Sequence, residues 1–92
     1  MNYNLIFSDK FTLKIKKLIK KNPSFKKKLK KTLELLKKDP FYPSLRLHQL
    51  QGNLKGKYSI SIDMSYRIIL SLIVKENEII LLDIGLHDEV YK

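Results

Sequence analysis

The side chains best suited to proton transfer and anion binding in this 92-residue chain lie around two apolar runs in its last third. Arg67 stands near the start of the first run, Tyr66 to Val74, and His87 follows the second, Ile79 to Ile84. His48 and His87 are the only histidines, and an imidazole with a pKa near ~6.5 exchanges protons at neutral pH. Arginine is a permanent bidentate cation for a phosphate. We therefore expect a catalytic group on the stiffest part of the fold.

Each candidate also has a plain structural interpretation. Tyr91 can donate to a phosphate or stack on a base, but a tyrosine so near the chain end is also typical of a frayed terminus. His48 in a loop is consistent with a surface or capping group, and His87 with a turn. Arg67 could pair with Asp63 across a hairpin, in a surface ion pair of little energetic value.

Length and composition favour a small single domain, residues 1–92, that needs no disulfide bond or structural metal to fold. The chain has no cysteine, and its two histidines lack the spacing of zinc ligands, so we expect no metal or cofactor. No apolar run approaches the ~20 residues that span a bilayer, and the N-terminus lacks the features of a signal peptide. A cytoplasmic protein that does not bind membranes is the expectation.

The positive charge is concentrated in the first half of the chain. Residues 1–38 contain 13 lysines and two acidic residues, a net charge of +11, whereas residues 39–92 carry a net charge of −1. An excess of this kind attracts polyanions, most often phosphate backbones. It is also consistent with a solvated lysine face that serves only solubility, so charge alone does not identify a partner.

Hydrophobic spacing predicts an edge strand followed by two helices. Asn2–Phe7 reads as the strand and Ser8 as a helix N-cap. Apolar residues then recur at helical spacing, with lysines on the opposite face, until Asn22-Pro23 separates the two helices and Asp39-Pro40 ends the second. The two apolar stripes should cover one face of a sheet as a helical hairpin.

The remaining strands follow from alternation and turn residues. Phe41–Leu50 contains proline and reads as a loop, and a glycine-bounded turn carries Lys55 near its tip. Tyr58 begins a half-buried strand, in which Ser59 falls on the polar side. The two apolar runs follow as further strands, joined by short turns. The predicted fold is α+β, in the order β-α-α-β-β-β, with a helical hairpin on a mostly antiparallel sheet.

Four short motifs, in their order and spacing, resemble the RelE/ParE toxin superfamily, and most of all its RelE and YafQ branches. They are His48-Gln49-Leu50-Gln51-Gly52, then Gly56, then Tyr66-Arg67-Ile68-Ile69-Leu70, and finally the segment from Ile84 to Tyr91. The resemblance covers nearly the whole chain. It implies a type II toxin that enters the ribosomal A site and cleaves messenger RNA without a metal.

Cleavage of this kind requires a base for the ribose 2′-hydroxyl, a cation for the phosphorane and an acid for the departing 5′-oxygen. By resemblance, His87 is the catalytic histidine near the C-terminus, Arg67 the arginine that begins the central strand, and Tyr91 the aromatic residue near the chain end. His48 matches the histidine that the YafQ-like branch places before its LxG motif. Further RNA contacts are expected from three residues of the same region: Lys55, Lys57 and Tyr66.

The chain departs from the YafQ-like pattern at two positions. Where that branch has a histidine on its second strand and an acid before the aromatic of its third, this sequence has Ser61 and Ser65, followed by Tyr66. Asp63 is a candidate replacement for the acid, although a shift of one residue would turn its side chain to the other face of a strand.

Three functions therefore remain open. The favoured one is a ribosome-dependent endoribonuclease, because both histidines coexist with Arg67. The others are a ParE-like inhibitor of DNA gyrase and a degenerate toxin that acts only as an antitoxin-binding or DNA-binding subunit. In each case we expect a cognate antitoxin with an acidic or amphipathic segment, and operator DNA bound only through that complex.

Overall fold

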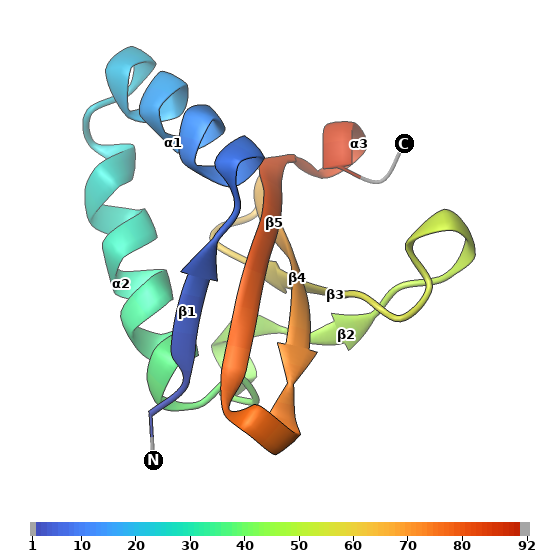
Figure 1. Cartoon of the computed structure of the whole chain (residues 1–92). Helices are drawn as coiled ribbons and strands as arrows, with labels where there is room; N and C mark the ends of the chain where they lie inside the picture. The colour runs from blue at the N-terminus through green and yellow to red at the C-terminus, as the bar shows by residue number, and fades with distance from the viewer. Residues whose placement is uncertain (1, 91–92) are drawn as a thin grey trace.

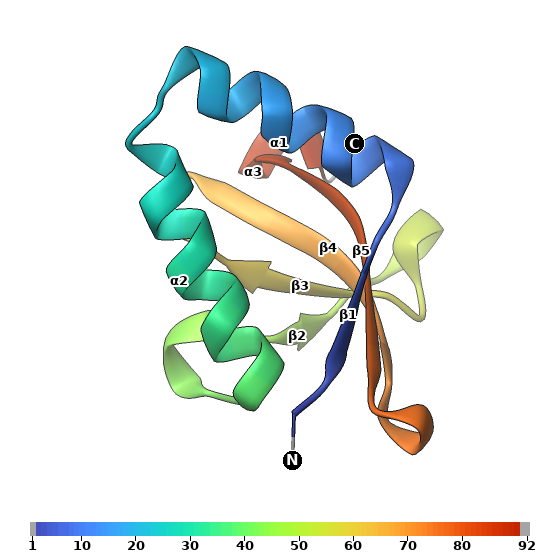
Figure 2. The ribbon, with the colours of Figure 1, turned by 60° about the vertical axis from the view of Figure 1, so that its left-hand side comes forward.

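A five-stranded sheet with the order β1-β5-β4-β3-β2 forms the centre of the molecule, and two helices lie on one face of it (Figures 1 and 2). The structure is a computed structural model that describes residues 2–90. Its helices and strands are β1 (Asn4–Phe7), α1 (Asp9–Lys21), α2 (Phe25–Lys38), β2 (His48–Gln49), β3 (Tyr58–Ser61), β4 (Tyr66–Ile73), β5 (Glu78–Leu86) and α3 (His87–Val90). The predicted α+β fold is confirmed, with β2 and α3 as additions.

The sheet is antiparallel except at β1. That strand pairs in parallel with β5, in the register Leu5 opposite Ile79, and forms the edge that the sequence predicts. β2, β3, β4 and β5 pair antiparallel in succession. The mostly antiparallel sheet is thus confirmed, and β4 lies at its centre with β5 on one side and β3 on the other.

The helix boundaries follow the capping and stop signals. Ser8 caps α1, because its Oγ accepts a hydrogen bond of 3.1 Å from the Phe11 N–H. The same hydroxyl donates to the Leu82 carbonyl at 3.1 Å, so the cap also attaches α1 to β5. α2 begins at Phe25, just after Pro23, and ends at Lys38, before the predicted stop.

The main core lies between the helical hairpin and one face of the sheet. We call this the covered face; Ile68 and Leu70 of β4 point into it and are fully buried. The helices contribute their apolar stripes, which leaves the lysines in solvent. The buried members are Phe11, Phe25, Leu29, Leu36, Leu45, Ile60, Ile68, Leu70, Ile79, Leu81 and Ile84.

A second, smaller apolar cluster lies on the other face, which we call the open face. Ile69 of β4 packs there with Leu50 from the segment after β2 and Val90 from α3. Figure 1 shows α3 and the loop between β2 and β3 on the side of the sheet away from α1 and α2. The cluster therefore holds both segments against the centre of the sheet.

The segment Phe41–Leu50 differs from the predicted loop at its end. His48 and Gln49 form the short strand β2, opposite Ser59 and Tyr58 of β3. Ser59 is fully buried, although the alternation placed it on the solvated side. The reason is that the small apolar cluster, with Leu50 from the segment after β2, covers part of the open face.

Candidate active site

The strand register places His48 and Arg67 on the open face. Residues directly opposite each other in an antiparallel pair project to the same side of the sheet. His48 is opposite Ser59, and Ser59 is opposite Ile69, whose side chain belongs to the open-face cluster. Arg67 precedes Ile69 by two positions on β4 and therefore shares its face. Arg67 is itself paired with Ser61.

Arg67 is a partly buried cation with unused donors. Its Nε and Nη1 are both buried, and neither has a hydrogen-bond partner among the described residues. The ion pair with Asp63 that the sequence allowed is not among the ion pairs of residues 2–90. Buried donors in folded proteins are nearly always satisfied, by protein or by ordered water, so Nε and Nη1 of Arg67 are expected to meet an acceptor from water or from a ligand.

Asp63 organises the turn between β3 and β4. Its Oδ1 accepts hydrogen bonds of 2.8 Å from the N–H groups of Ser65 and Tyr66, and its Oδ2 lies 3.4 Å from Lys28 Nζ. Partial burial raises the pKa of this carboxyl, but the two backbone bonds and Lys28 outweigh that effect and leave the pKa below its ordinary value. A carboxylate that resists protonation suits a structural role better than the acid role considered from the sequence.

His48 is exposed at the start of β2, with one nitrogen next to the backbone. Its Nδ1 lies 3.2 Å from the Arg46 carbonyl oxygen. A carbonyl only accepts, so this contact requires the proton on Nδ1 and leaves Nε2 of the neutral ring as an acceptor. The geometry fits a general base that receives a proton at Nε2.

His87 begins α3, directly after β5. Its backbone N–H donates to the Ser65 carbonyl at 3.0 Å, and its Nδ1 lies 3.5 Å from Asp88 Oδ1, with 56% of the side chain exposed. The Glu89 carboxylate accepts from the Leu86 N–H at 3.0 Å, as the acid of a capping box does. Backbone contacts therefore fix the start of α3 while the imidazole stays accessible.

The lysines near the turn lie on a loop of the open-face side. Gly52 and Gly56 have φ values of 65° and 90°, which confirms the predicted turn, and Lys55 between them is exposed. Lys57 is half-buried where the loop enters β3.

Tyr66 departs from the prediction that grouped it with the RNA contacts. Its ring packs against Phe25 in the main core, with the ring centroids 4.8 Å apart. Adjacent residues of a strand face opposite sides, so Tyr66 lies on the covered face while Arg67 lies on the open one. Tyr91 lies outside the described residues.

Arg46, which the sequence alone did not single out, lines a pocket together with Arg67. This pocket of about 390 Å³ is lined by Ser44, Arg46, Ser61, Ile62, Asp63, Met64 and Arg67. The signal was available, because Arg46 and Arg67 are the only arginines in a chain otherwise rich in lysine.

Two properties of the described residues bear on metal and membrane binding. Within residues 2–90, no three His, Asp or Glu side chains are grouped so that they could hold a metal ion. Over the same residues, the helices are too short or too polar to cross a bilayer.

Comparison with known proteins assigns the fold to a family. A family model described as the bacterial toxin YafQ of type II toxin–antitoxin systems matches residues 3–92. A search of curated protein sequences gave no match.

Solved structures with the same fold include E. coli YafQ, which is 22% identical with a TM-score of 0.80 over 98% of this chain and 99% of that one. The E. coli DinJ–YafQ complex aligns with a TM-score of 0.78 at 21% identity over 100% of both chains. A YoeB/ParE toxin from Agrobacterium tumefaciens aligns at 0.77 and 14% identity, over 91% and 98%. A metal-bound toxin from Helicobacter pylori aligns at 0.77 and 26% identity, over 98% and 99%. These relatives confirm the RelE/ParE-like fold, and the match over residues 3–92 shows that the chain belongs to the YafQ family of type II toxin–antitoxin toxins.

Proposed function

We propose that this toxin is a ribosome-dependent endoribonuclease that cleaves messenger RNA by attack of a ribose 2′-hydroxyl. One observation carries the proposal: Arg67, with its unpartnered buried donors, lies on β4, between His48 on the β2 side and His87 after β5. The attacking and leaving oxygens of a phosphoryl transfer lie roughly in line on opposite sides of phosphorus. A base and an acid on opposite sides of a bound phosphate match that geometry.

Each residue then has a defined step. His48 Nε2 takes the proton of the 2′-hydroxyl, and the resulting oxygen attacks phosphorus. Arg67 stabilises the negative charge that grows on the phosphorane oxygens. His87 gives a proton to the departing 5′-oxygen. The products are a 2′,3′-cyclic phosphate and a 5′-hydroxyl, and DNA resists because it lacks the nucleophile.

The outer RNA contacts come from the loop and the chain end. Lys55 and Lys57 would bind the flanking backbone, and Tyr91 would donate to the phosphate or stack on a base. Asp63 keeps the turn below Arg67 ordered and takes no part in proton transfer. None of these steps uses a metal or cofactor.

A cognate antitoxin is the proposed protein partner. The solved complex of DinJ with YafQ supports this partnership. The net charge of +11 on residues 1–38 would attract an acidic segment. Operator DNA would be contacted only through that complex, and the ribosomal target places the free toxin in the cytoplasm, away from membranes.

The test is cleavage in a translating ribosome system, mapped by primer extension. The parent should cut the messenger, and His87→Ala and Arg67→Ala should each reduce cutting by about 10²-fold or more. Lys75→Ala, an exposed charge in the turn between β4 and β5, is the matched control and should cut normally. Protein dialysed against EDTA before it meets the ribosomes should keep its activity.

Two results would overturn the proposal. Intact messenger together with blocked supercoiling by gyrase would identify a ParE-like inhibitor. Antitoxin binding without either activity would identify a degenerate toxin, with Ser61 and Ser65 as the first positions to restore.

A further inference from the structure

The pocket beside Arg67 brings together the only two arginines of the chain. Arg67 reaches it from β4, and Arg46 from the turn that follows the short helical segment Pro43–Leu45. The pocket has a volume of about 390 Å³, and Ser44 and Ser61 add hydroxyl groups to its lining. Arginine forms paired hydrogen bonds that match the oxygens of a phosphate.

The backbone at Arg46 adopts a conformation that arginine rarely takes. Its φ is 52°, in the left-handed region where glycine and asparagine are far more common. Two contacts hold it there: the Arg46 N–H donates to the Pro43 carbonyl at 3.1 Å, and the Arg46 carbonyl accepts from His48 Nδ1 at 3.2 Å. An unfavourable residue at this point of the turn indicates a use for its guanidinium.

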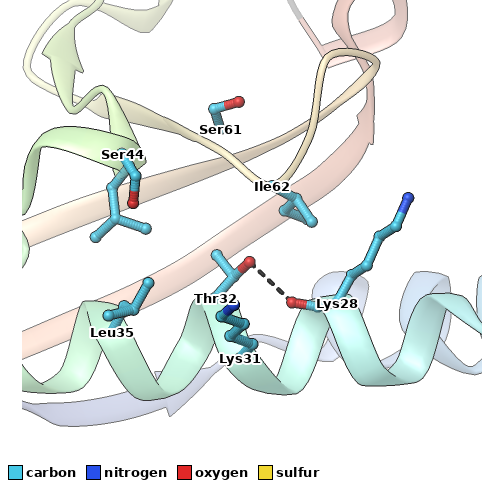
Figure 3. A pocket seen from close by; sticks show the side chains of 8 residues that line it. Lys28, Lys31, Thr32, Leu35, Ser44, Ser61 and Ile62 are labelled. Carbon is cyan, nitrogen blue, oxygen red and sulfur yellow. Dashed lines mark hydrogen bonds between the residues drawn. The ribbon is translucent and has the colours of Figure 1, made fainter.

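The one carboxylate in the pocket does not neutralise the two arginines. Asp63 is occupied by the N–H groups of Ser65 and Tyr66 and by Lys28. Lys28 and Lys31 also line the adjoining pocket between α2 and β3, which shares Ser44 and Ser61 with the first (Figure 3). The surroundings of the two arginines therefore remain positively charged.

The Ser61 hydroxyl has a partner within the turn. It donates to the Asp63 carbonyl at 2.8 Å, so the arginines supply the main donors for an anion. Arg67 Nε and Nη1 lack any acceptor within the described residues.

We infer that Arg46 and Arg67 bind one phosphate group of the RNA backbone between them, which makes Arg46 a second cation at the reacting phosphate. The identity of the ligand as RNA rests on the proposed function, whereas binding of a phosphate by the pocket does not. Because Arg46 also contacts His48 through its carbonyl, the clamp fixes the phosphate relative to the base.

The two arginines allow a direct measurement. In a ¹⁵N spectrum the Nε–H region should contain two side-chain signals, one from each arginine, and Arg46→Lys assigns them. On titration with inorganic phosphate, both signals should shift with a single Kd. Arg46→Gly, which suits the left-handed backbone, should weaken that Kd about tenfold, and Lys75→Ala should leave it unchanged. A response from only one arginine, or from neither, would refute the shared pocket.

Binding of an uncleavable 2′-O-methyl RNA extends the test to the polymer. Arg46→Gly should lower the slope of log K against log salt by about 0.7, the contribution of one phosphate contact in a single strand. If the parent binds phosphate through both arginines but never cuts messenger, the proposed function fails and the pocket stands. If it cuts messenger while Arg46→Gly changes neither phosphate binding nor the salt slope, the pocket fails and the proposed function stands.

Discussion

The two faces of the sheet have opposite compositions, and the difference separates stability from chemistry. On the covered face, the side chains of β3, β4 and β5 meet two helices in a continuous apolar core. On the open face, a small apolar cluster around Ile69 holds the segment after β2 and α3 against the sheet. His48 and Arg67 lie in the adjoining part of the sheet. A single strand serves both, because adjacent residues of β4 alternate between them.

The difference between the two faces predicts which property of the protein a substitution on each face should change. A change on the covered face should act through the free energy of unfolding, whereas a change at the polar positions of the open face should act on phosphate binding and proton transfer. Substitutions matched across the two faces test this division.

The largest effect should come from the histidines. His48→Gln and His87→Gln should each lower the single-turnover cleavage rate by about 10² to 10⁴, because each removes a proton-transfer group. Both side chains are exposed, so the free energy of unfolding should stay within about 0.5 kcal/mol of the parent. Urea unfolding is the control, and a loss of activity matched by unfolding would contradict the division between the faces.

Next come the apolar residues of the two faces. Leu70→Ala, on the covered face, should lower the free energy of unfolding by about 2 to 5 kcal/mol, since the side chain is fully buried. Val90→Ala, in the open-face cluster, should lower it by only about 1 to 2 kcal/mol. It should also slow cleavage in protein that remains folded, because Val90 holds the helix that begins at His87. If Leu70→Ala and Val90→Ala lowered the free energy of unfolding equally, and Val90→Ala cleaved normally, the proposed difference between the two faces would be wrong.

Arg67→Met should separate stability from cleavage activity most clearly. It replaces a guanidinium that has unpartnered buried donors with an apolar side chain of similar length. We expect the free energy of unfolding to rise by about 1 kcal/mol while cleavage falls by about 10²-fold. Chemical denaturation checks the first and primer extension the second; a marked loss of stability would show that Arg67 supports the fold.

The smallest effect concerns Asp83, which joins β5 to α1. It lies 2.7 Å from Lys14 Nζ and 3.3 Å from Lys10 Nζ. Burial raises the pKa of this carboxyl, but the Lys14 hydrogen bond and the Ile84 N–H lower it by more, so the pKa lies below its ordinary value. At pH 7, Asp83→Asn should lower the free energy of unfolding by about 1 kcal/mol.

The pH dependence of that difference has a definite sign. A lowered pKa in the folded state stabilises above the unfolded value, near ~3.9, and the contribution disappears as the pH falls through the folded value. The gap between the parent and Asp83→Asn should therefore be full at pH 7 and shrink below about pH 4 in urea titrations. A gap that does not change with pH would mean that the ion pairs with Lys10 and Lys14 contribute nothing.

Much of the fold could be predicted because its signals are local. The Ser8 cap, the proline that separates the helices and the alternation that begins at Tyr58 each act within a few residues. β2 was missed because only two residues pair, and their partners on β3 are about ten positions away. The burial of Ser59 was missed for the same reason, since the segments that cover it join only in three dimensions.

The sequence predicted which residues form the candidate site, but not how the folded sheet positions them relative to one another. His48, Arg67 and His87 follow from their chemistry and the family resemblance, but the strand order that separates the two histidines appears only in the folded sheet. Tyr66, which the resemblance groups with the RNA contacts, packs against Phe25 on the covered face, because a shift of one residue changes the face. Arg46 was missed because a left-handed backbone at arginine has no sequence signature.

The pairing of β1 with β5 also determines when this toxin can first exist in folded form. Asn4–Phe7 is made more than 70 residues before its partner, Glu78–Leu81. The helical hairpin can form from local contacts as it emerges, whereas the sheet must wait for this distant pairing, which is the slow kind of step in folding. Arg67 and His87 are assembled with that sheet. A ribosome that is translating this sequence therefore carries an incomplete site until Glu78–Leu86 and His87 have been made.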